Sequence, residues 1–129
     1  MRAAADPTIP PEGASVPAGV EWDAIRTPRP MGLAALRRLS APEGAVLVDP
    51  VGRALFFFVR PGTAQNWCLP LTVALGKGHL VELPPGGRDR PPGAYWLAAS
   101  TCLVLTLARP LHLALRAVLT SMHSTEESS

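Results

Sequence analysis

The sequence predicts a small α/β protein of the α+β kind, in which a mixed or antiparallel sheet with a central β-hairpin packs against two helices. Two apolar runs, residues 45–48 and 54–59, flank an Asp-Pro-Val-Gly-Arg turn. Asp first, Pro second and Gly fourth match type I turn chemistry, so we expect these runs to pair as a hairpin. Residues 110–122 carry apolar side chains at helical spacing, and 129 residues suit a single domain.

The remaining elements follow from shorter patterns. Leu33, Leu36 and Leu39 form an apolar stripe after Pro30, which predicts a helix over residues 31–39. Both hairpin strands are apolar throughout, so each of their faces should be covered. Further strands are predicted at residues 19–25, 72–75, 79–83 and 95–97.

Both ends of the chain are predicted to be disordered. Residues 1–19 contain four prolines and no apolar periodicity, and residues 120–129 end in the polar run STEESS. Neither stretch carries enough apolar surface to offset the entropy lost on ordering it. The folded domain is therefore expected at residues 20–119.

Charge and cysteine content point to a cytoplasmic protein without a membrane span. The net charge is +2, too small to predict nucleic-acid binding from bulk charge. Cys68 and Cys102 lie in apolar runs without disulfide or zinc spacing, so we expect buried thiols in a reducing compartment. The longest apolar run, residues 97–108, is shorter than the ~20 residues that a membrane helix needs.

One segment is a candidate phosphate-binding site: Gly76, Lys77, Gly78 and His79. Two glycines allow the backbone to approach an anion, and Lys77 and His79 supply charge. The segment lacks the third glycine of a dinucleotide motif and the Gly-Lys-Ser/Thr of a Walker loop. A plain glycine-rich turn between two strands is the alternative interpretation.

Other polar and aromatic groups give weaker signals. Carboxylates are few in the predicted domain, so no catalytic residue, metal site or cofactor is predicted. His112 and His123 lack metal-ligand spacing and are expected in solvent. Trp22, Trp67 and Trp96 either stack nucleobases or anchor the core and loops. Four arginines either form a basic rim for a phosphate backbone or are scattered over the surface: Arg53, Arg60, Arg88 and Arg90.

The order of these elements resembles the primase–polymerase family. Residues 21–36 are similar in layout to its first motif, in which a strand ends in acidic residues and turns through a glycine into a helix. Residues 69–81 resemble its second motif, a proline–threonine lead-in and a glycine-rich turn before a strand-borne histidine, here His79. The hairpin and Trp96 also resemble short bacterial proteins of the N-terminal-like class of this family. The resemblance covers roughly residues 20–119 and implies that His79 contacts nucleotide phosphate.

The chain departs from that family at the residues that bind the catalytic metal ions. The family's first motif holds its metal ions with two carboxylates two residues apart. The equivalent stretch here, residues 25–29, contains Arg26 and Arg29, and Asp23 is the nearby carboxylate. An arginine cannot bind Mg²⁺, so the resemblance implies a reduced relative that keeps the scaffold without the catalytic groups.

These observations favour a non-catalytic regulatory or interaction module, with a protein partner and weak residual nucleotide or nucleic-acid binding. A metal-dependent nucleotidyl-transfer enzyme is the first alternative; it would need Mg²⁺ and would depend on His79 and on Asp23 or Glu82. A protein-interaction module without a ligand site is the second, acting through residues 88–92 or an apolar patch. A homodimer remains open in each case, since the hydrophobic content of 47% is high for so little charge.

Overall fold

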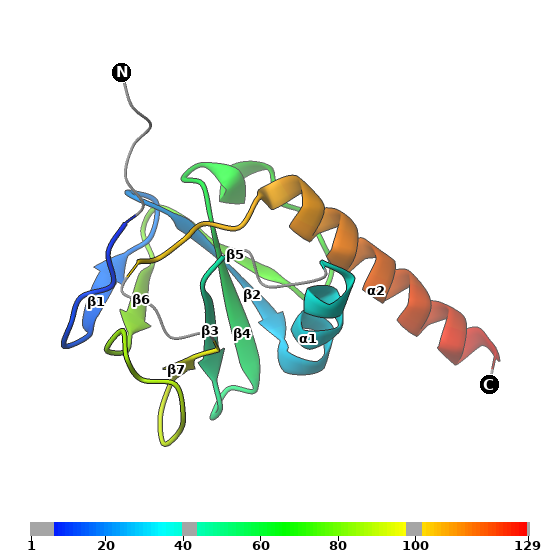
Figure 1. Ribbon diagram of the computed structural model, residues 1–129. Coiled ribbons are helices and arrows are strands. Elements are labelled where there is room, and N and C mark those ends of the chain that lie inside the picture. The colour runs from blue at the N-terminus through cyan, green and yellow to red at the C-terminus, as the bar shows by residue number, and fades with distance from the viewer. Residues whose placement is uncertain (1–6, 40–43, 98–101, 129) are drawn as a thin grey trace.

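The computed structural model describes residues 7–39, 44–97 and 102–128, with side chains to residue 122. They form three layers, visible in Figure 1: a two-stranded ribbon, a five-stranded sheet and a pair of helices. The predicted α+β class is confirmed. Within these residues no helix combines the length and the hydropathy needed to cross a bilayer.

The central sheet is antiparallel throughout and is built around the predicted hairpin. Its strand order is β5-β2-β4-β3-β7. Val46 lies opposite Phe57 and Asp49 opposite Ala54, and the Gly52 N–H donates to Asp49 Oδ1 at 3.1 Å, which closes the turn as its sequence indicates. The strands are β2 (Asp23–Pro28), β3 (Val46–Asp49), β4 (Ala54–Val59), β5 (Val73–Leu75) and β7 (Tyr95–Trp96).

Two helices cover one face of this sheet and bury the first half of the core. They are α1 (Arg29–Arg38), with Pro30 in its first turn, and α2 (Ala108–Ser128). The C-terminal part of α2 extends past α1, away from the sheet (Figure 1). The sequence predicts a disordered tail at residues 120–129, whereas α2 continues to Ser128, because a formed helix adds residues at little further cost. The helix-facing core comprises Ile25, Met31, Leu36, Val48, Leu55, Phe57, Leu111 and Leu115, among others.

A two-stranded ribbon covers part of the other face of the sheet. Its first strand lies before residue 20, where the folded domain was predicted to begin. Strand β1 (Ala14–Pro17) pairs antiparallel with β6 (Leu80–Leu83), with Ser15 opposite Glu82. Earlier still, Pro7 O accepts the Leu103 N–H at 2.7 Å, and Ile9 is only 4% exposed. Residues 7–19 are thus ordered. Their partners lie more than sixty positions away in sequence, so local composition carries no sign of the pairing.

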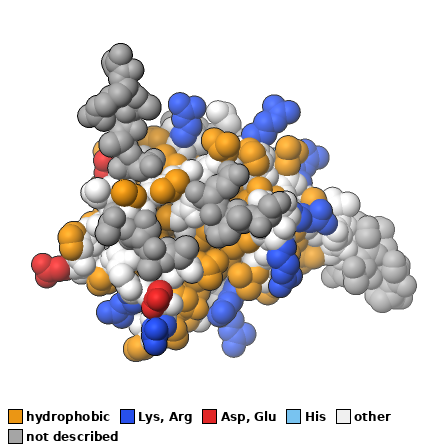
Figure 2. All heavy atoms as spheres, in the orientation of Figure 1, with side chains coloured by type: hydrophobic (Ala, Val, Ile, Leu, Met, Phe, Trp, Pro, Cys, Tyr) orange, Lys and Arg blue, Asp and Glu red, His pale blue; other side chains and the backbone are white. Residues whose placement is uncertain are grey.

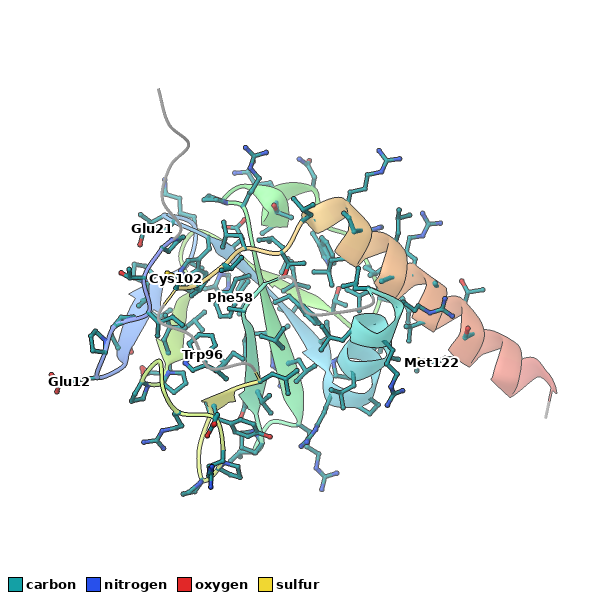
Figure 3. The ribbon with its side chains drawn as sticks, viewed as in Figure 1. Glu12, Glu21, Phe58, Trp96, Cys102 and Met122 are labelled. Atoms are coloured by element: carbon teal, nitrogen blue, oxygen red, sulfur yellow. The ribbon has the colours of Figure 1, made fainter. Side chains whose placement is uncertain are left out.

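Aromatic side chains fill the space between ribbon and sheet. Phe58 meets Trp22 edge-on, with ring centroids 4.9 Å apart, and its centroid lies 5.8 Å from that of Trp96 (Figure 3). The anchoring role predicted for Trp22 and Trp96 is confirmed, because both are buried and closed to stacking with a ligand. The expectation for Cys68 and Cys102 was wrong: both are exposed, since their apolar neighbours lie in loops and not in strand interiors.

The ordered N-terminal segment gives a first testable prediction. Ile9→Ala should lower the free energy of unfolding by about 2 kcal/mol or more, because it opens a cavity under the ribbon. Val20→Ala is the matched control: Val20 is 69% exposed and should change stability little. Urea unfolding followed by circular dichroism measures both. Equal, near-zero effects would mean that residues before β1 do not pack on the core.

Candidate functional site

The antiparallel register gathers three segments at one end of the sheet. Asp23, the first residue of β2, lies opposite Val59, the last residue of β4. Ala24 lies opposite Leu75, the last residue of β5. The 3₁₀ helix η1 (Thr63–Asn66), which follows β4, and the turn at residues 76–79, which follows β5, therefore flank Asp23.

These segments enclose a cavity of about 280 Å³, which we call the Asp23 cavity. Gly76 and Lys77 of the predicted phosphate segment lie in its wall, whereas Gly78 and His79 do not. Asp23, which the sequence indicates as a nearby carboxylate and as a residue on which the enzyme alternative would depend, is the buried carboxylate of this site. The cavity is lined by Gly19, Asp23, Gly62, Ala64, Gln65, Gly76 and Lys77.

Asp23 holds the start of the 3₁₀ helix η1 through two hydrogen bonds. Its side chain is 1% exposed, and Oδ2 accepts the Gly62 N–H at 2.9 Å and the Ala64 N–H at 2.8 Å. Oδ1 is buried and has no hydrogen-bond partner among the residues that the structure describes. The backbone donors at the start of η1, which would otherwise suit an anion, are thus already held by a carboxylate. A buried acceptor without a donor costs stability unless water or a ligand supplies the bond.

The turn at residues 76–79 is closed by its own hydrogen bonds. The His79 N–H donates to Gly76 O at 3.2 Å, and His79 Nδ1 lies 3.3 Å from the same oxygen. The imidazole is exposed and folded back on the turn, outside the cavity wall. Of the two charged groups predicted for a phosphate site, the structure therefore brings only Lys77 to the cavity.

Gly19 fixes the position of that turn. Its φ is +90°, and a Cβ placed on it would lie 2.6 Å from Lys77 Cα. Ala18 N–H donates to His79 O at 2.8 Å, and Gly19 N–H donates to Trp22 O at 2.7 Å. The segment before β2 and the turn after β5 are thus in direct backbone contact.

The four arginines proposed as a basic rim are spread over the molecule. Arg53 and Arg60 lie beyond opposite ends of β4, about 20 Å apart at strand rise per residue. Arg88 donates to Pro92 O at 3.1 Å within its own loop, and Arg90 pairs with Asp89 at 3.4 Å. Figure 2 shows Lys and Arg side chains around the outline of this face, without one continuous patch. The geometry favours the scattered-surface interpretation.

The carboxylates do not gather into a metal site. Glu21, labelled in Figure 3, stands two residues before Asp23 and is exposed, whereas Asp23 is buried. Glu82 is hydrogen-bonded to the Ser15 hydroxyl on the ribbon, away from the Asp23 cavity. Across residues 7–39, 44–97 and 102–122, no three His, Cys, Asp or Glu side chains are placed to hold one metal ion.

Trp67 and His112 form a separate contact beside α2. Their rings meet edge-on with centroids 4.9 Å apart, and Trp67 Nε1 donates to Thr72 Oγ1 at 2.9 Å. His112 is half-buried by this contact, so the expectation of a fully solvated ring was wrong. The side chain of His123 lies outside the described residues. Trp67 serves as a loop anchor, which is one of the two roles predicted for it.

Comparisons with protein-family models, with curated proteins and with solved structures each give no match to this chain.

Proposed function

We propose that this chain is a non-catalytic, regulatory module that binds a single nucleotide in the Asp23 cavity. One observation carries the proposal: the cavity brings the buried carboxylate of Asp23 together with Lys77, the only lysine of the sequence. A ligand that contacts both Asp23 and Lys77 needs a hydrogen-bond donor for the carboxylate and an anionic group for the ammonium. A nucleotide has both, in the amino group of its base and in its phosphates.

The polarity of the site sets the orientation of this ligand. Because Asp23 already holds the donors at Gly62 and Ala64, a phosphate cannot use them and would be repelled by the carboxylate. The phosphates therefore belong at Lys77, at the exposed side of the cavity, and the base belongs at Asp23. With a volume of about 280 Å³, just below the roughly 300–1,000 Å³ of small-molecule sites, the cavity is too small for an oligonucleotide.

We further propose that the chain is a reduced relative of the primase–polymerase family. The order of a strand bearing Asp23, a glycine-containing helix and a later glycine-rich turn beside that strand supports this relationship. The separation of Asp23 from Glu82, in the walls of different cavities, favours binding over metal-dependent nucleotidyl transfer.

Calorimetric titration with ATP, GTP and free triphosphate tests the proposed site. Lys77→Gln should weaken both nucleotides and triphosphate about tenfold, because it removes one charge-assisted contact. Asp23→Asn should weaken the nucleotides, since the amide nitrogen replaces an acceptor with a donor. It should not weaken triphosphate, because it removes a charge that repels phosphate. Arg37→Gln, on the exposed side of α1, is the charge-matched control. Unchanged nucleotide affinity in both site variants would refute the assignment, and turnover that requires Mg²⁺ would favour the enzyme alternative.

A further inference from the structure

A second cavity lies between the ribbon and the open face of the sheet, and it shares no lining residue with the Asp23 cavity. Its volume is about 340 Å³, within the range of roughly 300–1,000 Å³ that small-molecule sites occupy. We call it the ribbon groove. Its apolar walls include Leu47, Phe56, Leu75 and Leu80, which come from four different strands.

Arg26 is the only cation among the described residues that line this groove, and its position in the sheet is unusual. The register places it in a row across the five strands, between Val73 and Phe56, with Leu47 and Trp96 beyond. Residues paired in this way point to the same face of a sheet, so Arg26 is the one charged member of an apolar row. A central position of this kind normally carries an apolar side chain.

The Arg26 guanidinium lacks a carboxylate partner in the described part of the chain. Its nearest acceptor is Gly52 O at 3.4 Å from Nη2, a long bond, and no carboxylate oxygen lies within ion-pair distance. Two acids, Asp49 and Glu82, line the groove as well, and each has another hydrogen-bond partner. Asp49 Oδ1 accepts the Gly52 N–H at 3.1 Å, and Glu82, on an exposed position of β6, is hydrogen-bonded to Ser15.

We propose that the ribbon groove binds a small aromatic or alicyclic carboxylate, with its ring against Phe56 and its carboxylate on Arg26. Leu75 and Leu80 give the ring an apolar floor, while a planar guanidinium matches a carboxylate through two parallel N–H bonds. A half-buried cation among apolar walls gains more from such a pair than an exposed arginine does. The groove is thus a second ligand site, independent of nucleotide binding.

Three probes with the same ring and different head groups test this proposal: 2-naphthoate, 2-naphthylmethanol and 2-naphthylmethylammonium. Amide NMR titration of the full chain should show shifts at Arg26, Phe56 and Leu80, with naphthoate bound about tenfold more tightly than the alcohol and the ammonium weakest. Arg26→Gln should reduce naphthoate affinity to that of the alcohol. Arg37→Gln should leave the order intact.

The head-group series on the wild-type protein decides the matter even where Arg26→Gln perturbs folding. Equal affinities for the three probes would mean that Arg26 only extends its charged end to solvent over an apolar surface. Equal affinity, preference for the ammonium, or shifts confined to residues outside the groove would each overturn the proposal.

Discussion

Trp96→Ala should lower the free energy of unfolding by about 3–5 kcal/mol, because it empties a fully buried position of the core. Its indole is 0% exposed and packs against Phe58 between the ribbon and the sheet. Nε1 also lies 3.2 Å from Pro84 O and 3.1 Å from Pro85 O, so the side chain ties the loop after β6 to strand β7. Truncation removes the packing and both contacts. Urea unfolding followed by far-ultraviolet circular dichroism measures the loss.

Two further variants separate the contributions of the indole. Trp96→Phe keeps an aromatic ring but leaves the proline carbonyls without their donor, so it should cost about 1–3 kcal/mol. Trp67→Ala removes a half-buried indole outside the ribbon-side core and should cost less than Trp96→Ala. A Trp96→Ala protein as stable as Trp67→Ala would contradict the packing described for the ribbon layer.

Gly19→Ala should both destabilise the fold and displace the turn that carries Lys77. At φ +90° an alanine is strained by about 1–3 kcal/mol, and its Cβ would lie 2.6 Å from backbone atoms of Lys77. Because backbone cannot rotate away as a flexible side chain can, the two segments must move apart. We expect a loss of about 2–4 kcal/mol of stability and a clear drop in affinity for nucleotide at the Asp23 cavity.

Gly78→Ala is the matched control for this prediction. Gly78 lies in the same turn at φ +99°, but a Cβ added there meets no atom within 4 Å. It should therefore show the strain alone, without displacement of Lys77. Thermal unfolding and nucleotide titration distinguish the two variants. Equal effects on nucleotide affinity would show that contact with Gly19 does not position the site.

Local sequence patterns were sufficient for the elements whose partners are close in the chain. The Asp49–Arg53 turn sets the hairpin register, and the spacing of Leu111, Leu115 and Val118 identifies the face of α2 that is buried. The β1–β6 ribbon could not be predicted in the same way. Its pairing joins Ala14 to Leu83 and depends on a free strand edge that exists only once the chain has folded.

The candidate site could be predicted only in part, because some of its residues come together only through the register of the sheet. The glycines around Lys77 indicate a tight turn, and the turn does reach a cavity. Asp23 becomes prominent only through the register that places β2 between β4 and β5. The charge of its ring makes His79 a candidate in the sequence, yet the backbone geometry of the turn directs that ring toward Gly76 O. Arg26 shows no local signal either, because only the row of paired residues reveals its apolar surroundings.

The most direct test of nucleotide binding at the Asp23 cavity is an amide NMR titration of the full chain with ATP, with and without Mg²⁺. We expect saturable shifts at five residues that line the cavity: Asp23, Gly62, Ala64, Gly76 and Lys77. The amides of Arg26 and Leu80, in the ribbon groove, should stay in place. A well-dispersed spectrum in which none of the cavity amides moves at millimolar nucleotide would contradict the account.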